Sequence, residues 1–462
     1  MAAFKSRSCF VGLIFILLVL WGGSRPALAP GHPAETASRK RNIKRTDDPV
    51  LIAGNKMPTL AGVEIGGLSL MRWRGNSFEP VPFQVDKRNV KGEYTFGQAG
   101  AANGKPARPG SPLLQADDEM AFMIGDAGDR APATSLPANV EKGVELEIVD
   151  PVPGDDGGRA WAYLFAFKKD APRSERRYLK GKPDTQKGAW RIEAQNYSIE
   201  AGKNAVYYNL LAINRPDGAP GPNLIDRLKI RGTYSIHLSG HKIPLAADDL
   251  IQANIVGWND GPVRVLVKGD GYVDTAVKFR IKGYSIIEFY GNLFIYSLYF
   301  HIPFEPGKLL KSVDLYGADD FSKSAYGLHY YDKCNPWNKD IVFDGKMSDA
   351  EKNMNVKDDR NWFALTGPQG SLLTRVFLPK EWGFVKKGAY YLDDAARPDP
   401  PEAFPGVSAA GFSFSNLTDV RRGWARYSTH HYFPRQFKMG AETRILNIMD
   451  HPLEVKVRPI GK

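Results

Sequence analysis

The segment from residue 329 to residue 337 concentrates the side chains in this chain that are best suited to contact a sugar. It reads His-Tyr-Tyr-Asp-Lys-Cys-Asn-Pro-Trp and has the character of a loop. Tyr and Trp rings present an apolar face with a polar tip, and carboxylates can bind sugar hydroxyls. We therefore expect Tyr330, Tyr331, Asp332 and Trp337 to contact a sugar. The alternative is that these aromatic rings pack back onto the scaffold as a small additional core.

Five acidic residues between positions 117 and 129 form the best candidate set of oxygen ligands, namely Asp117, Asp118, Glu119, Asp126 and Asp129. Ca²⁺ takes oxygen ligands from loop carboxylates, so it is the one metal cofactor that this cluster suggests. The spacing does not match the helix-loop-helix calcium motif. The alternative, which the sequence favours, is that these carboxylates cap turns at both ends of a strand over 120–124.

Other patterns with chemical potential are weaker. His237 and His241 lie around a Ser-Gly turn signal, so we expect their rings on opposite sides of a hairpin and not on one metal. The sequence has no glycine-rich phosphate loop, dinucleotide fingerprint or Gly-x-Ser-x-Gly motif, which disfavours nucleotide and serine-hydrolase chemistry. Several Asp-Asp pairs could serve glycoside hydrolysis, but the sequence does not show which carboxylates meet in one cleft. Whether the protein is an enzyme is therefore left open.

The amino terminus has the layout of an export signal. Two basic residues precede an apolar run over Cys9–Leu20, and an Ala-Leu-Ala stretch ends at Ala29. The run is shorter than the ~20 residues that span a membrane, and no second run of that length follows. We therefore expect a signal peptide over 1–29 and a body exported to the periplasm or beyond. Because Pro30 suits cleavage poorly, cleavage after Ser24 or an uncleaved short anchor are the alternatives.

The formal net charge of +11 is concentrated near the amino terminus. Residues 1–46 hold eight Lys or Arg side chains against one acidic side chain, which leaves +4 for the rest of the chain. We expect residues 30–48 to form a basic, disordered leader, and its tract 39–45 could bind an anionic surface. We expect no nucleic-acid partner, because the body is nearly balanced in charge and shows no basic recognition helix.

Composition and patterning predict an all-β protein. The chain has 46 Gly, 33 Pro, 24 Phe, 20 Tyr and 9 Trp residues, which suits many short strands joined by tight turns. Once the signal is removed, Cys334 is the one cysteine left, so burial must stabilise the fold without a disulfide. We expect an N-terminal β-domain over 49–170, a linker or long loop over 171–189 and a large antiparallel β-sandwich over 190–462.

Two local features within the predicted sandwich are specific. The apolar run over 284–300 should form two strands that turn at Gly291-Asn292, and it should mark the centre of the core. Ser348 is a suitable N-cap with Glu351 three positions later, which predicts a short helix over 348–354.

Two stretches resemble known proteins. Val-Pro-Phe-Gln-Val-Asp at 81–86, followed by Asp-Asp-Glu-Met-Ala-Phe-Met at 117–123 and Asp-Ala-Gly at 126–128, resembles a pattern in uncharacterised secreted bacterial proteins. Asp-Gly-Pro-Val-Arg at 260–264 is similar to strand openings in galactose-mutarotase-like β-supersandwich domains of carbohydrate-active proteins. The second resemblance implies a supersandwich fold and a carbohydrate role, and it transfers no active-site residue.

These observations together predict an exported envelope or extracellular protein that binds a polysaccharide. If the protein is an enzyme, it would also process that polysaccharide. Arg264 is expected to bind an acidic group of that ligand. The alternative is a non-catalytic envelope protein that assembles with another protein through its aromatic edges. An open cleft lined by Tyr, Trp, Arg and carboxylates would favour the sugar, whereas a flat apolar patch would favour the protein partner.

Overall fold

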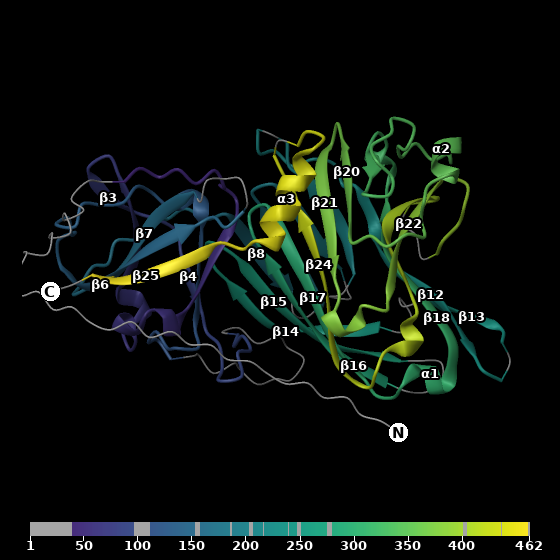
Figure 1. Ribbon diagram of the computed structural model, residues 1–462, viewed down its shortest axis with the longest axis horizontal. Helices are drawn as coiled ribbons and strands as arrows, with labels where there is room; N and C mark the ends of the chain where they lie inside the picture. Colours follow the sequence, from purple (N-terminus) through teal and green to yellow (C-terminus); the bar gives the residue numbers. More distant parts are fainter. Residues whose placement is uncertain are drawn as a thin grey trace, which may run out of the picture. The chain divides into compact units, whose positions relative to one another are not determined.

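The computed structural model describes residues 39–460 except 97–110, 153–157, 185–186, 203–206, 216, 239, 247–250, 275–279, 401–403 and 436. The described residues belong to one compact unit. The predicted signal peptide and the first part of the predicted leader lie outside them. The protein is all-β, as predicted, and its described strands form five antiparallel sheets (Figure 1).

The N-terminal strands form two of these sheets. In a three-stranded sheet, β5 (Glu119–Met123) lies between β1 (Pro49–Ala53) and β4 (Gln84–Asp86). A five-stranded sheet has the order β25 (Glu454–Ile460), β6 (Val140–Val149), β7 (Arg159–Phe167), β2 (Leu68–Arg74) and β3 (Ser77–Pro80). Alternate side chains of β6 and β7 are buried in one apolar cluster with the inner side chains of β1 and β5, as expected for two sheets that share a core.

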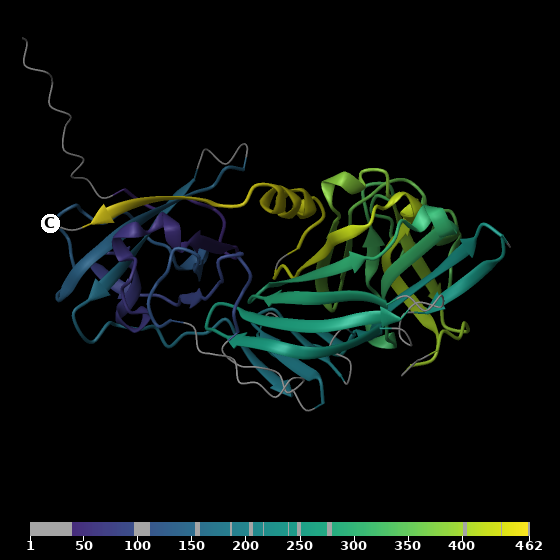
Figure 2. The ribbon, with the colours of Figure 1, turned by 90° about the horizontal axis from the view of Figure 1, so that it is seen from below.

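The predicted sandwich over 190–462 includes residues 454–460, and this boundary is wrong. β25 pairs with β6, where Val457 lies opposite Leu146, and Figure 2 shows it running from α3 (Ala441–Asp450) along the N-terminal sheet. Arg458 binds Glu145 and Glu147 on β6. The pairing joins strands more than 300 positions apart in the sequence, which local residue patterns cannot reveal.

The remaining strands form a two-layer sandwich. One layer is an eight-stranded sheet in the order β14 (Ile251–Asp260), β15 (Val265–Asp274), β16 (Arg280–Phe289), β17 (Leu293–Ile302), β24 (Gly423–Tyr432), β21 (Gly370–Phe377), β20 (Trp362–Gly367) and β19 (His329–Tyr331). As predicted, β16 and β17 are joined through Gly291-Asn292.

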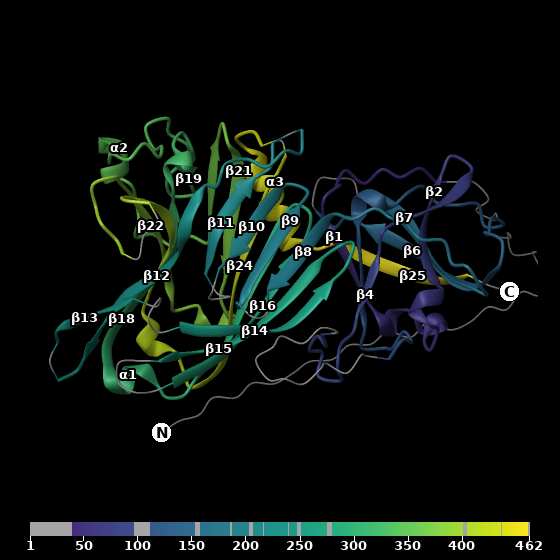
Figure 3. The ribbon, with the colours of Figure 1, turned by 180° about the vertical axis from the view of Figure 1, so that it is seen from behind.

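The second layer consists of two sheets, which face the viewer in Figure 3. A four-stranded sheet has the order β11 (Tyr208–Ile213), β10 (Tyr197–Ala201), β9 (Ala189–Ala194) and β8 (Leu179–Asp184). A five-stranded sheet has the order β13 (Lys242–Ala246), β12 (Ile225–Ile236), β18 (Leu310–Phe321), β23 (Val407–Ser415) and β22 (Lys386–Asp394).

Aromatic side chains fill the space between the two layers. Trp190 of β9 packs against Phe289 of β16 with ring centroids 5.0 Å apart, and Tyr197 of β10 stacks on Phe433 at 4.4 Å. These rings belong to the largest cluster of buried apolar residues, which includes Phe289 and Leu293 from the predicted core run. Burial of this kind stabilises the fold by about 25 cal/mol per Å² of apolar surface.

Helices are few and short in the described residues. They are α1 (Pro306–Leu309), α2 (Asp349–Lys352) and α3. Single 3-10 turns lie at Gly54–Lys56, Pro58–Leu60, Ile65–Gly67, Ile124–Asp126, Lys323–Ala325, Lys380–Trp382 and Leu417–Asp419. Ser348 and Glu351 form the predicted capping box of α2. None of the helices in the described residues is long and apolar enough to cross a membrane.

Two predictions of unstructured chain are corrected. Residues 39–48 of the predicted leader pack against the protein, because Arg45 is buried and pairs with Asp48 and Asp150. Residues 179–184 of the predicted linker form the edge strand β8, in which Leu179 is buried and the polar side chains face outward. Pro183 is tolerated there because an edge strand has a free side that needs no ladder hydrogen bond.

Candidate functional site

The predicted sugar-contact residues of the 329–337 segment are mostly interior. Tyr330, Tyr331 and Asp332 are 0%, 4% and 2% exposed. The Tyr330 hydroxyl donates to Asp332 Oδ2 at 2.8 Å, and Arg360, itself fully buried, donates to the same oxygen at 2.5 Å. The Tyr331 hydroxyl donates to Glu442 Oε2 at 3.2 Å. The prediction of surface sugar contact is therefore wrong for these three side chains, which pack back on the sheet.

Trp337 is the exposed member of the predicted set, at 41%. It lies beside a hollow of about 480 Å³ that Asn338, Asn353 and Asn355 also line. These amides already stabilise turns: the Asn353 Nδ2 group donates to Asp349 O, and Asn355 Oδ1 accepts from two backbone amides. The hollow thus offers an aromatic ring with amides that are already engaged in local hydrogen bonds.

A second hollow, of about 780 Å³, lies along β12, β13, β18 and β23. Arg231 is its charged lining residue from β12, and its guanidinium donates to Pro400 O at 3.2 Å and lies 3.5 Å from Asp399. Tyr316, another lining residue, stacks on Tyr390 with centroids 3.8 Å apart. The polar groups of this hollow are therefore largely engaged with the protein itself.

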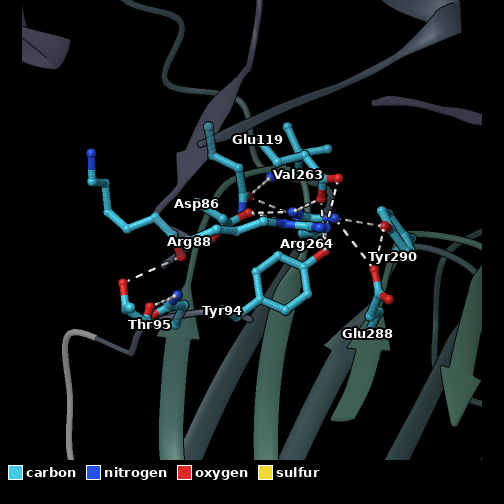
Figure 4. A network of polar contacts seen from close by, with 12 residues as sticks. Asp86, Arg88, Tyr94, Thr95, Glu119, Val263, Arg264, Glu288 and Tyr290 are labelled. Atoms are coloured by element: carbon cyan, nitrogen blue, oxygen red, sulfur yellow. Dashed lines mark hydrogen bonds and ion pairs between the residues drawn. The ribbon is translucent and has the colours of Figure 1, made fainter. Parts of the chain in front are cut away.

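Arg264 occupies the centre of a buried polar network, which Figure 4 shows from close by. The residue is fully buried, directly before β15. Its guanidinium binds Asp86 Oδ2 at 2.8 and 2.7 Å and Glu119 Oε1 at 2.7 Å. It also approaches Glu288 at 3.3 Å and the Tyr290 hydroxyl at 3.1 Å. The predicted acidic partner of Arg264 is thus supplied by the protein's own carboxylates and not by a ligand.

The rim of this network is formed by the loop that follows β4. Arg88 donates to Glu119 Oε2 and to the Tyr94 hydroxyl, each at 2.7 Å, and Tyr94 donates to Glu119 Oε1 at 2.7 Å. Burial opposes ionisation of Glu119, but the charge of Arg264 and the bond from Tyr94 outweigh it, so the pKa of Glu119 is lowered. The network therefore fixes β4, β5 and the loop to the start of β15 and the end of β16.

The five acidic residues of the predicted calcium cluster do not converge. Asp117 is exposed on a turn. The other four pair with separate cations: Asp118 with Lys87, Glu119 with Arg88 and Arg264, Asp126 with Arg176, and Asp129 with Lys40. No group of three or more His, Cys, Asp or Glu side chains within the described residues is arranged to hold a metal ion. The predicted calcium site is therefore wrong, since four of the five carboxylates pair with cations at separate places and the fifth, Asp117, lies on an exposed turn.

Three histidines, His237, His430 and His431, contact other parts of the fold. His237 lies 3.0 Å from Gly307 O through its Nε2 atom. On β24, His431 stacks on Phe294 with centroids 4.3 Å apart, and the neighbouring His430 packs on Phe377 at 4.5 Å. Burial lowers the pKa of His431 to about 3, so this ring is neutral across the ordinary pH range.

An aromatic group lies on the outer face of the eight-stranded sheet. Tyr284 of β16 and Tyr299 of β17 are directly opposite each other in the ladder, and their rings stack with centroids 4.6 Å apart and 8° between the planes. Trp424 of β24 lies 6.0 Å from Tyr284 and 5.5 Å from His301. Trp424 is 62% exposed, so its ring is available to a ligand.

The strand period explains why this group faces outward. Ile287 and Phe289 of β16 point into the sandwich and are buried, so Tyr284, an odd number of positions away, lies on the opposite face. Glu288 lies on that same outer face, where the Arg264 network covers it. The outer face of β16 therefore has one end closed by the N-terminal loop and one end with half-exposed rings. Period-2 alternation within 284–300 is the signal that separates the two faces, so the prediction that this run marks the centre of the core holds for its inner side chains only.

A scan against protein-family models and a search of the curated proteins find no match to this chain.

Proposed function

We propose that this protein is exported and binds a polysaccharide across the outer face of its eight-stranded sheet, over Tyr284, Tyr299 and Trp424. The observation that carries the proposal is the exposed Trp424 ring beside a stacked tyrosine pair on a regular sheet. Trp combines a large apolar face with a polar indole N–H, which suits the faces and hydroxyls of a sugar.

The dimensions of the aromatic group support an extended ligand. Neighbouring strands lie about 4.8 Å apart, so side chains from β16 to β24 cover about 10 Å across the sheet. That distance is long enough for more than one sugar ring. Strands also hold their side chains in fixed positions, so a chain of sugars would be bound with little reorganisation of the protein.

A polysaccharide fits this face better than the predicted alternative of a protein partner. A protein-docking patch would be flat and apolar over several hundred Å². Here charged side chains cover the two tyrosine rings, Lys268 over Tyr284 and Arg426 over Tyr299. The export half of the proposal is supported by the signal-like residues 1–29.

The experiment is a glycan array with the full chain lacking residues 1–29, compared with Trp424→Ala and Trp337→Ala. These two variants each remove one exposed Trp, from different places. We expect the parent and Trp337→Ala to bind the same glycans and Trp424→Ala to lose at least about tenfold in affinity. Far-UV circular dichroism checks that both variants stay folded. No binding by the parent, or equal binding by Trp424→Ala, would reject the proposal.

Export is tested separately with a tagged full-length chain. We expect the tag in the periplasm or the medium, and in the cytosol when residues 1–29 are deleted. Recovery of the full-length chain with cytosolic markers would reject this half of the proposal.

A further inference from the structure

The outer face of the eight-stranded sheet carries a four-residue ladder in which two aromatic rings lie between two cations. In strand order its members are Lys268 of β15, Tyr284 of β16, Tyr299 of β17 and Arg426 of β24. Lys268 Nζ lies 5.0 Å from the Tyr284 ring centroid, and the Arg426 guanidinium carbon lies 5.5 Å from the Tyr299 centroid. The tyrosine pair is therefore flanked by one cation on each side, which is a cation–π arrangement at both ends.

Strand register places these side chains on one face. Tyr284 is directly opposite Tyr299, and Tyr299 is directly opposite Arg426. Lys268 is opposite Ile286, two residues from Tyr284 and so on the same face. The ladder is thus a product of sheet geometry and does not depend on a loop.

The cations of this ladder are weakly neutralised by the protein. Arg426 is exposed and donates to Ser297 Oγ at 3.1 Å, and it forms no ion pair with a carboxylate in the part of the chain that the structure describes. Lys268 lies 3.8 Å from Asp270, in a pair whose side chains are 33% and 52% exposed. Such an exposed pair binds weakly and yields to a competing anion. Arg264, in contrast, is buried among three carboxylates.

We infer that the polysaccharide bound at this face is acidic, with carboxylate or sulfate groups that pair with Lys268 and Arg426 while a sugar ring stacks on Trp424. This inference rests on the proposed function and adds the class of ligand. The guanidinium of Arg426 matches the geometry of a carboxylate or sulfate, with which it can form two parallel hydrogen bonds. Lys268 supplies a point charge three strands away, which is about 14 Å at the usual strand spacing. Acidic groups on separate sugars of one chain can therefore meet both cations.

The covered ring faces strengthen this reading. Tyr284 and Tyr299 stack on each other, and each ring also carries a cation, so neither ring has a free face for a sugar. A purely neutral sugar site would expose ring faces for stacking. Trp424 offers such a face, whereas the tyrosine pair lies between two positive charges.

The test compares three soluble polymers: polygalacturonate as a carboxylate ligand, dextran sulfate as a sulfate ligand, and dextran as a neutral ligand. Affinities are measured by isothermal titration for the parent, for Arg426→Gln with Lys268→Gln, and for Trp424→Ala. Arg191→Gln is the matched control, because Arg191 is exposed on β9 in the other layer.

We expect the double charge variant to lose about tenfold or more in affinity for one or both acidic polymers and to be unchanged toward dextran. Parent affinity for the acidic polymer should fall steeply between about 50 and 500 mM salt, and less steeply for the double variant. Which acidic polymer binds more tightly identifies the anionic group. Arg191→Gln should match the parent.

Two outcomes would overturn the inference and leave the proposed function standing: dextran bound as tightly as the acidic polymers, or no effect of the charge substitutions while Trp424→Ala still abolishes binding. Single-stranded DNA is added as a control for charge alone, and DNA bound as tightly as the acidic polymers would also overturn the inference. Failure of every polymer to bind the parent would overturn the inference, and the glycan array then decides separately whether the proposed function stands.

Discussion

Replacing Arg264 by Met should destabilise the protein strongly, because the substitution leaves buried carboxylates without their counter-charge. Arg264 is fully buried, and Asp86, at 5% side-chain exposure, receives two of its contacts. After the substitution Asp86 keeps one hydrogen bond, from Gln84 Nε2 at 2.8 Å. Glu119 keeps Arg88.

The expected loss of stability follows from the contacts that each carboxylate partner of Arg264 loses. Removing one member of a buried ion pair costs about 3–5 kcal/mol, since it leaves an uncompensated charge in the interior. Because Asp86 loses its cation entirely and Glu119 keeps one, we expect about 4 kcal/mol. The matched control is Arg191→Met, which breaks an exposed pair with Glu193 and Glu200 and should cost less than about 1 kcal/mol.

Urea unfolding at neutral pH, followed by fluorescence and circular dichroism, measures the free energy of unfolding of the parent and of each variant. The pH dependence gives a second check. The lowered pKa of Glu119 contributes stability that is present above its ordinary value of 4.5 and is lost as pH falls through its value in the folded state. The difference in free energy of unfolding between the parent and Arg264→Met should therefore become smaller at acidic pH. The account of the network would be refuted if Arg264→Met lost no more free energy of unfolding than Arg191→Met. It would also be refuted if the difference between parent and Arg264→Met grew at acidic pH.

Three further predictions concern other parts of the fold. Asp332→Asn should lower stability by about 3 kcal/mol, because it unbalances the buried pair with Arg360, yet leave glycan affinity unchanged; unfolding and titration together check it. Burial raises the pKa of Asp319 to about 7, so stability should fall as pH rises from about 4 to 7. Asp319→Asn keeps an acceptor for Tyr208 and should make that fall in urea midpoints smaller, the remainder coming from Asp320, whose pKa burial raises to about 6. Truncation after residue 453 removes β25 and exposes the edge of β6, so light scattering should show aggregation that the parent lacks.

Local features of the fold could be predicted from the sequence. The turn at Gly291-Asn292 and the capping box of Ser348 and Glu351 depend on residues a few positions apart, so residue type alone predicts them. The all-β class followed from strand-length apolar runs broken by Gly and Pro. These predictions hold because the decisive interactions are short in sequence.

Pairing between residues far apart in the chain could not be predicted from the sequence. The sequence around Arg45 predicts a solvated basic tract. In the structure Arg45 is instead paired with Asp150, more than a hundred positions away. The residue types around Tyr330 and Asp332 are typical of a loop, yet both side chains are buried, and Asp332 pairs with Arg360, 28 positions away. A charge or ring can be assigned to the surface or the interior only when its distant partner is known.

The candidate site illustrates the same limit. Alternation shows that Tyr284 and Phe289 lie on opposite faces of a strand, but it does not show which face meets the second layer. The position of Trp424 beside Tyr284 depends on pairing between β17 and β24 across more than 120 residues.

The central claim, that the outer face of the eight-stranded sheet binds an acidic polysaccharide, is tested most directly by carbene footprinting with and without polygalacturonate or dextran sulfate. Trp424 and Trp337 are both exposed in the free protein, at 62% and 41%, so each reports on its own surface. We predict that labelling of Trp424 and Tyr299 falls on ligand addition while labelling of Trp337 stays constant. Protection of Trp337 with Trp424 unchanged would contradict the account.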